Sequence, residues 1–231
     1  MVNSVWWKEI EAVIMEKSLL KHPFYQAWTM GTLTREDLCV YARQYYQQES
    51  RFPRFVSAVH SNCPELKVRQ ELLKNLNEEE SGPENHPELW LRFAQAVGAS
   101  RESVGDAVAL PQTVACISAF DALSRSKRWW VGLAALYAYE AQQPDVARTK
   151  IEGLKARYGL HSKDALGFFE VHQAADAWHS EVEKQILMRQ ADRNPGVQAE
   201  IWDAVSEACN ALNTLLDGVC QVRGIYAPSL N

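Results

Sequence analysis

Apolar side chains recur along most of the chain at the three-to-four-residue period of an amphipathic helix. Residues 4–18 illustrate the pattern, with Val5, Ile10, Val13 and Ile14 at steps that fit one side of a helix. No run of residues alternates apolar and polar positions between turn signals, as a half-buried strand would. The pattern therefore predicts an all-α protein without a sheet.

Prolines, glycines and short polar residues mark the ends of the expected helices. The segment PFYQAWTMG is expected to form a short helix closed by Gly31, and Thr34 with Asp37 resembles a capping box that opens the next helix. Pro53 breaks or kinks that helix. Further boundaries fall at Pro64, Gly82-Pro83, Gly98 and Pro144, with two helices within 110–143 and long ones over roughly 165–191 and 196–221. Nine or ten helices with short loops and no linker predict one compact helical domain over residues 1–231.

The composition narrows the class of protein. With 47% apolar residues among 231, the chain can bury a large core. Its net charge of −5 argues against nucleic-acid binding, where basic clusters supply most of the affinity. No uninterrupted apolar stretch reaches the roughly 18 residues of a membrane span, and the charged N-terminus does not resemble a signal peptide. We therefore expect a cytoplasmic protein that does not bind membranes, with free thiols at Cys39, Cys63, Cys116, Cys209 and Cys220.

The sharpest local motif is His172-x-x-x-Asp176-x-x-His179. Steps of four and seven residues bring all three side chains onto one face of a helix. Imidazole nitrogen and carboxylate oxygen together suit iron, manganese or zinc. The alternative is a solvated helix face that carries two surface histidines.

A second candidate group combines Glu79 and Glu80 with His86, which follows a Gly-Pro break. The turn allows Glu79 and His86 to converge. Acidic residues at a helix C-terminus oppose the macrodipole, and a bound cation would offset that cost. The alternative is an ordinary charged helix end followed by a loop histidine that caps the next helix.

The third candidate is Glu140, which follows a mostly apolar stretch and is expected to be buried. A buried carboxylate needs a partner, either a metal or an arginine or lysine. Carboxylates and histidines that project inward from several helices are how bundle proteins hold di-iron centres. The residues therefore predict a site for two divalent metal ions, most simply iron, with the ligand set Glu79, His86, Glu140, His172, Asp176 and His179.

Several segments resemble a known family. They are HPFYQAW (22–28), YARQYYQQESRFPRFVSAVHS (41–61), NLNEEESGPENHPELW (75–90), ALYAYEAQQPDVARTKI (135–151) and HQAADAWHSE (172–181). They are similar to the chlamydial death-domain-associating protein (CADD) and its bacterial folate-pathway relatives, which belong to the haem-oxygenase-like di-iron oxidases with TenA and PqqC folds. The two ends, about 1–20 and 195–231, match poorly, and the family's cysteine-rich tail is absent.

The resemblance implies a haem-oxygenase-like helical bundle whose metal ligands fall on the same six residues. It further implies formation of p-aminobenzoate, the aromatic part of folate, from one of the protein's own tyrosines, with O2 and an external reductant. The matching tyrosine is Tyr25, and the lysine that would help, as a candidate amino donor, is Lys150. The residues alone favour a half-buried core tyrosine and a surface lysine at these positions. Phe168 stands where the chlamydial relative has a tyrosine.

The resemblance leaves the metals open between two iron ions and a manganese–iron pair, and the fold that it implies suggests a homodimer. Three other functions remain: a dimetal oxidase acting on a free small molecule, a metal-free TenA-like hydrolase with a nucleophilic cysteine, and an interaction protein. Turnover of an added substrate, unaffected by Tyr25→Phe, would identify the first. The scattered cysteines and the ligand set count against the second, and the absent tail counts against the third.

Overall fold

A computed structural model describes residues 4–226, and every regular element in that range is helical. The shorter elements are α1 (Ser4–Glu16), η1 (Leu19–Lys21), α2 (Pro23–Met30), α4 (Phe52–Asn62), α6 (His86–Val97), α7 (Arg101–Gly105), α9 (Trp129–Glu140) and η2 (Pro195–Val197). The longer helices are α3 (Arg35–Glu49), α5 (Leu66–Glu80), α8 (Pro111–Ser124), α10 (Gln143–Ala156), α11 (Lys163–Arg193) and α12 (Gln198–Arg223). The expected all-α class is confirmed.

Most expected helix ends are found where the sequence places them. Gly31 closes α2 in the left-handed conformation with φ 71°, and Gly98 closes α6 with φ 107°. Thr34 caps α3 by a full capping box, in which Thr34 Oγ1 accepts from the Asp37 amide and Asp37 Oδ2 accepts from the Thr34 amide. These local signals act within one turn of helix, so they do not depend on the rest of the fold.

Two details of the expected helices are wrong. The described residues contain twelve α-helices and not nine or ten, partly because the five-residue α7 carries too short a pattern to be recognised and partly because Pro53 separates α3 from α4 completely. The helix that was expected to start at Pro64 starts at Leu66, because Pro64 lies before the N-terminal cap Glu65 of α5. Helix ends fray, so a boundary one or two residues from the expected one is ordinary.

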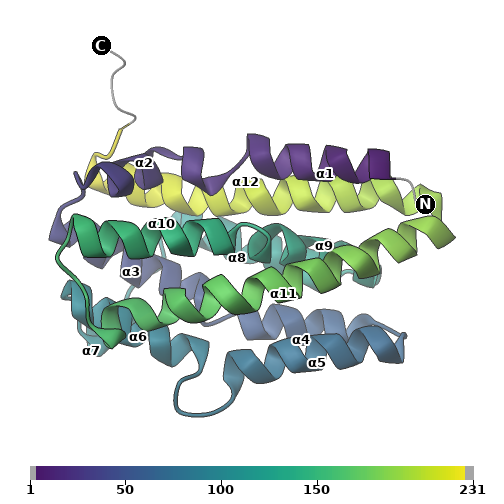
Figure 1. Cartoon of the computed structure of the whole chain (residues 1–231), viewed down its shortest axis with the longest axis horizontal. Helices are drawn as coiled ribbons and strands as arrows, with labels where there is room; N and C mark the ends of the chain where they lie inside the picture. The colour runs from purple at the N-terminus through teal and green to yellow at the C-terminus, as the bar shows by residue number, and fades with distance from the viewer. Residues whose placement is uncertain (1–3, 227–231) are drawn as a thin grey trace.

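The helices pack side by side with their axes mostly along the long direction of the molecule (Figure 1). Helix α12 packs against α1, α8 and α9, and α11 packs against α6, α9 and α10, while α4 pairs with α5. Helix α9 lies between these groups, and ten of its twelve residues are buried. A helix that is apolar all round belongs in the interior, so α9 is the central helix of the bundle.

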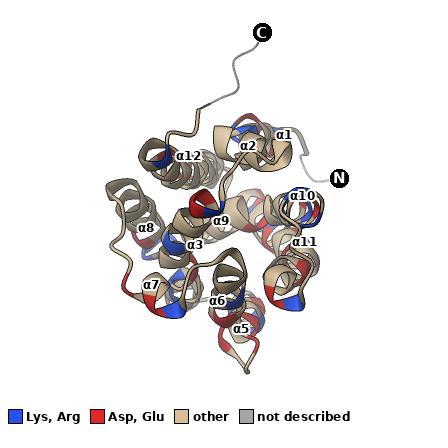
Figure 2. Cartoon of the chain, turned by 90° about the vertical axis from the view of Figure 1, so that its left-hand side faces the viewer, with Lys and Arg blue, Asp and Glu red and all other residues tan. Residues whose placement is uncertain are grey.

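Acidic and basic residues are interspersed on the outer helices, as the end-on view shows for α5, α7, α10 and α11 (Figure 2). None of the helices within residues 4–226 has the length and apolar content needed to cross a bilayer.

Candidate metal centre

The six residues singled out from the sequence lie in the interior of the bundle, on four helices. Helix α5 supplies Glu79, α6 supplies His86, α9 supplies Glu140, and α11 supplies the remaining three. All six side chains are buried, namely Glu79, His86, Glu140, His172, Asp176 and His179. Ionisable groups are rarely buried in such numbers unless they are paired or bind a metal.

The three candidate residues of α11 face inward, so the alternative of a solvated histidine face is wrong. The ring of His172 stacks on Phe168 at a centroid distance of 3.9 Å, and its Nδ1 lies 2.7 Å from the Phe168 carbonyl oxygen. Because a carbonyl can only accept, Nδ1 carries the proton and Nε2 is left with its lone pair. Fixing the tautomer in this way is how proteins orient a histidine that binds a metal.

His86 and Glu79 approach each other at the start of α6. Nδ1 of His86 lies 2.9 Å from Oε2 of Glu79, yet neither atom has a hydrogen-bond partner of acceptable geometry within residues 4–226. Two ligand atoms about 2.1 Å from one ion and at right angles to each other stand about 3.0 Å apart. The separation of the pair therefore fits two ligands of one metal ion, whereas the alignment of the two atoms does not meet hydrogen-bond geometry.

His86 also lies next to His172, with ring centroids 4.2 Å apart. Burial lowers the pKa of His172 well below its usual value, and the neighbouring His86 lowers it further. For His86, burial lowers the pKa, but the neighbouring carboxylates of Glu79, Glu49 and Glu78 together outweigh burial, so the net direction is upward. A neutral His172 is the form that binds a metal.

Glu140, the last residue of α9, has no arginine or lysine partner among the described residues. Its Oε1 accepts a hydrogen bond from Asn75 Nδ2 at 2.7 Å, and its Oε2 is buried without a partner. Burial raises the pKa of Glu140 to about 7, although His179 and Asn75 act in the opposite direction. The alternative of an arginine or lysine partner is thus not found among the described residues, where an amide and other members of the site surround the carboxyl group.

Asp176 and His179 complete the expected set. Burial and the charges of Glu140, Glu79 and Glu49 raise the pKa of Asp176 well above its usual value, which places its carboxyl group among theirs. The Nε2 of His179 lies 2.9 Å from Oε2 of Glu78. A carboxylate on one ring nitrogen leaves Nδ1 for a metal, a common arrangement around metal-binding histidines.

Two buried carboxylates at this site were missed in the sequence. Glu49 ends α3, and Glu183 lies on α11 one turn beyond His179. Ligand atoms of Glu49, His86 and His172 all lie within 4.8 Å of one another. Spacing is the signal that the sequence offers for both, since Glu49 continues a four-residue stripe from Tyr41 and Tyr45, and Glu183 lies four residues after His179.

Both oxygens of Glu183 are buried without a hydrogen-bond partner of acceptable geometry within the described chain. Its pKa is raised well above the usual value by burial and by the charges of Glu140 and Asp176. Glu183 also borders a small hollow between α5, α9 and α11, together with Asn75 and His179. It therefore adds one more buried carboxyl group to the cluster that contains Glu140 and Asp176.

Three of the buried carboxylates stand at the C-terminal ends of their helices. Glu49 and Glu140 are the final residues of α3 and α9, and Glu79 is the last residue but one of α5. Helix C-termini carry partial negative charge, which disfavours a carboxylate. These helix ends and the unpartnered carboxylate oxygens meet in the core and produce a negative potential there. Divalent cations would compensate that potential. The donor set is of the kind that binds iron or manganese.

Lys150 lies in an aromatic cage and not at the surface, so the expectation from residue type is wrong. Its side chain is 0% exposed, and Nζ has no hydrogen-bond partner in the described residues. The ring centroids of Tyr25, Tyr41, Tyr45, Trp90 and Phe169 lie 4.9–5.6 Å from Nζ. Burial lowers the pKa of Lys150 to about 7, while Glu49 acts in the opposite direction. The aromatic faces partly replace the hydration that the ammonium group loses.

Tyr25 is buried in the same cage, with a ring centroid 5.6 Å from Lys150 Nζ. Its hydroxyl lies 3.3 Å from that of Tyr41, and the rings of Tyr41 and Tyr45 are 5.3 Å apart. The Tyr45 hydroxyl donates to Tyr139 at 2.9 Å. The Tyr139 hydroxyl in turn donates to Oε2 of Glu49 at 3.0 Å. A row of tyrosines thus leads from Tyr25 to the carboxylate cluster.

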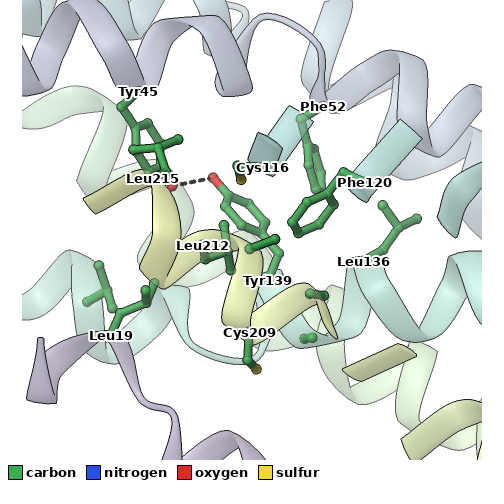
Figure 3. Close-up of a cluster of buried hydrophobic side chains, with 14 of the residues drawn as sticks. Leu19, Tyr45, Phe52, Cys116, Phe120, Leu136, Tyr139, Cys209, Leu212 and Leu215 are labelled. Carbon is green, nitrogen blue, oxygen red and sulfur yellow. Dashed lines mark hydrogen bonds between the residues drawn. The ribbon is translucent and has the colours of Figure 1, made fainter. Parts of the chain in front are cut away.

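Figure 3 shows the middle of this row, where the hydroxyls of Tyr45 and Tyr139 meet among apolar side chains. Phe52, Phe120, Leu212 and Leu215 surround the pair. Burial raises the pKa of Tyr45 and of Tyr139 well above 10, so both phenols are protonated. Protonated hydroxyls in dry surroundings keep fixed donor and acceptor roles.

The five cysteines are free and buried, as expected, and none has the exposure of a nucleophile. Burial raises the pKa of Cys116 well above its usual value, that of Cys209 to about 12 and that of Cys220 to about 11. These thiols are therefore protonated and unreactive at neutral pH, which argues against the hydrolase alternative.

Comparison with known sequences agrees with this chemistry. The profile of a family described as iron-containing redox enzymes matches residues 39–213. The 4-aminobenzoate synthase of Nitrosomonas europaea is 43% identical over 228 residues, covering 95% of this chain and 92% of that protein. The 4-aminobenzoate synthase of Chlamydia pneumoniae is 37% identical, covering 89% and 96%. A pyrroloquinoline-quinone synthase of Ectopseudomonas mendocina is 28% identical over about half of each chain, 52% and 51%.

Solved structures share the fold. A TenA homologue from Pseudomonas syringae superposes with a TM-score of 0.82 at 17% identity, covering 94% of this chain and 93% of that one. A CADD-like protein of unknown function from Nostoc punctiforme gives a TM-score of 0.72 at 17% identity, covering 97% and 100%. At this level of identity the likeness concerns the fold alone, which is the haem-oxygenase-like bundle expected from the sequence.

Proposed function

This chain belongs to the family of iron-containing redox enzymes, and on that premise we propose that it forms 4-aminobenzoate from its own Tyr25. As a member of the family it is an oxidoreductase. The names of its relatives in Nitrosomonas and Chlamydia support 4-aminobenzoate as the product. The ring source and the amine source are inferred from this chain's own residues.

The observation that carries the proposal is the enclosure of Tyr25 with Lys150 in one sealed cage. The two side chains are both fully buried, and the cage is filled by aromatic rings. A tyrosine at this place has an amine beside it and a row of phenols connecting it to the carboxylate cluster. A free aromatic substrate would have to displace these rings, whereas Tyr25 already occupies the position.

The metal ligands proposed are Glu79, His86, Glu140, His172, Asp176 and His179. Their unpartnered oxygens, the tautomer of His172 and the close approach of Glu79 to His86 support the assignment. Two ions bound there, iron in both positions or iron with manganese, would activate O2 with electrons from an external reductant.

The chemistry of the product defines what the side chains must do. Conversion of a tyrosine to 4-aminobenzoate requires cleavage of the Cα–Cβ bond, oxidation of Cβ to a carboxylate, loss of the phenolic oxygen as water and formation of a bond from the ring to nitrogen. With Lys150 as the donor, its Cε–Nζ bond also breaks and Cε is left oxidised as an aldehyde. O2 with the reductant supplies the oxidation. An amine can transfer nitrogen only when unprotonated, and burial places the pKa of Lys150 at about 7, so much of it is neutral near pH 7. The cage excludes water, which would compete with the amine.

Isotope labelling tests the two sources separately. We expect reduced, iron-loaded protein exposed to O2 to release 4-aminobenzoate that carries label from ring-¹³C tyrosine and from ε-¹⁵N lysine incorporated into the chain. The amount should not exceed one equivalent per chain because the protein is consumed. Many equivalents, or an unlabelled ring, would refute self-sacrifice and indicate a dimetal oxygenase that acts on a free substrate.

Matched variants locate the label in the chain. Tyr25→Phe and Lys150→Met should each abolish product. The half-buried Tyr46, on α3, and the exposed Lys155, on α10, supply the controls Tyr46→Phe and Lys155→Met, which should release wild-type amounts. Product from Tyr25→Phe would assign the ring to a neighbouring tyrosine, and product with ¹⁵N from Lys150→Met would assign the amine to another lysine.

A further inference from the structure

Glu49 has a buried carboxylate and is not one of the six proposed metal ligands. Only 1% of the residue is exposed. Its Oε2 accepts the hydrogen bond of Tyr139 at 3.0 Å, while its Oε1 has no partner among the described residues. Lys150 could offer a counter-charge, yet its Nζ is itself unpartnered and no ion pair joins the two among the described residues. One oxygen of Glu49 is therefore free within the core.

The carboxylate of Glu49 lies close to the rings of His86 and His172. A ligand atom from each of the three residues falls within 4.8 Å of the other two. Three equally spaced ligand atoms about 2.1 Å from a shared ion stand at most about 3.6 Å from one another, so the three need to close by up to roughly 1 Å. Adjustments of that size are available to a glutamate with three side-chain torsions.

We propose that Glu49 is a seventh protein ligand, bound through Oε1 to the ion held by His86 and His172. The inference rests on the metal centre of the proposed function and adds a residue from α3 to it. The two oxygens of Glu49 then have separate tasks, since one binds the metal and the other holds the hydroxyl of Tyr139. The carboxylate becomes the direct junction between the metal centre and the tyrosine row that ends at Tyr25.

A purely structural role for Glu49 makes a different prediction. If the carboxylate served only as the acceptor for Tyr139, an uncharged acceptor of the same shape would replace it. If it binds the metal, the loss of charge weakens that ion specifically. Glu49→Gln removes the charge and keeps the shape, whereas Tyr139→Phe removes the hydrogen bond and keeps the charge. The two variants therefore separate the two roles.

The experiment measures metal binding and not product. Wild type, Glu49→Gln and Tyr139→Phe are equilibrated without oxygen against buffered Fe(II), and bound iron is determined by elemental analysis. Co(II) loading provides a second measurement, because its visible absorption changes with coordination number. For Glu49→Gln we expect one of the two ions to bind 10- to 100-fold more weakly or worse, with an altered Co(II) spectrum. Tyr139→Phe should keep both ions and the wild-type spectrum.

Wild-type affinity at both positions with an unchanged spectrum in Glu49→Gln would overturn the proposal. Equal loss of iron in Glu49→Gln and Tyr139→Phe would also overturn it, because Glu49 would then act only through Tyr139. Thermal melts of the metal-free variants show whether each is folded. If Gln is not tolerated, Glu49→Asp serves instead, since the shorter side chain withdraws the oxygens and keeps the charge.

These results are independent of the proposed product. Wild-type protein that binds two ions but releases no 4-aminobenzoate would refute the proposed function and leave the Glu49 result standing. Wild-type protein that releases product while Glu49→Gln binds iron normally would refute the ligand role alone.

Discussion

A lysine ammonium enclosed by aromatic rings loses the water that would stabilise its charge. For Lys150 the rings return part of that free energy, but burial still lowers the pKa to about 7. The unfolded chain binds the proton up to a pKa of about 10.4, so it binds more protons than the folded chain between about pH 7 and pH 10.4. The folding stability contributed by this residue therefore rises with pH in that interval, and the full penalty is present below pH 7.

Lys150→Met should consequently stabilise the metal-free protein. The gain is expected to be on the order of 4 kcal/mol at pH 6 and to shrink to roughly 2 kcal/mol at pH 9. Urea unfolding of both proteins at the two pH values measures it, and the difference between them cancels other titrating groups. A gain that is the same at pH 6 and pH 9 would show that Lys150 keeps an ordinary pKa.

At the scale of single elements, α9 has to approach its neighbours closely to place Glu140 in the centre. Gly132 makes that approach feasible, because a Cβ built there would lie 2.6 Å from Val59 Cγ2 and 3.0 Å from the Ser124 Cα. The second contact is to backbone, which cannot rotate away. Gly132 is needed because it lacks a side chain and not for its backbone conformation, since its φ is not positive.

We therefore expect Gly132→Ala to lower the free energy of unfolding by about 1–3 kcal/mol, although alanine is the better helix former. Gly105 on α7 provides the control, because a Cβ there meets nothing within 4 Å and its φ is not positive. Gly105→Ala should leave stability unchanged or raise it slightly. Denaturant unfolding compares the pair, and equal effects would mean that α9 can shift to accommodate a methyl group.

For the whole molecule, the acidic core costs stability unless it is neutralised. Without metal, burial raises the pKa of Glu49 to about 8 and that of Glu140 to about 7, against about 4.3 in the unfolded chain. Between the unfolded and the folded pKa values, the folded state binds more protons than the unfolded state does. Stability from these groups is thus fully present at low pH and is lost as pH rises through about 7 to 8.

The metal-free protein should therefore become less stable between pH 5 and pH 8, and loading with Fe(II) or Mn(II) should restore stability most at pH 8. The ion binds only the folded state and replaces the missing protons as counter-charge. Calorimetric melts of chelator-treated and metal-loaded protein at pH 5, 6.5 and 8 measure this. A metal-induced shift of melting temperature that does not grow with pH would contradict it.

Local sequence determined the helices and their ends because the responsible interactions span a few residues. Gly31 and the Thr34–Asp37 box are found where the pattern places them. The spacing of His172, Asp176 and His179 determined that they share a helix face. The short α7 was missed because five residues carry too little periodicity to be distinguished from a turn.

Only the tertiary structure decided which faces are inside. The stripe Tyr41–Tyr45–Glu49 and the residue Glu183 have the spacing of site residues, but a surface helix can carry the same pattern. Lys150 is the clearest case, because nothing along the chain separates it from an exposed lysine, and its cage comes from α2, α3, α6 and α11. Periodicity fixes the direction of a side chain around its own helix, whereas burial and charge environment depend on which other helices pack against it.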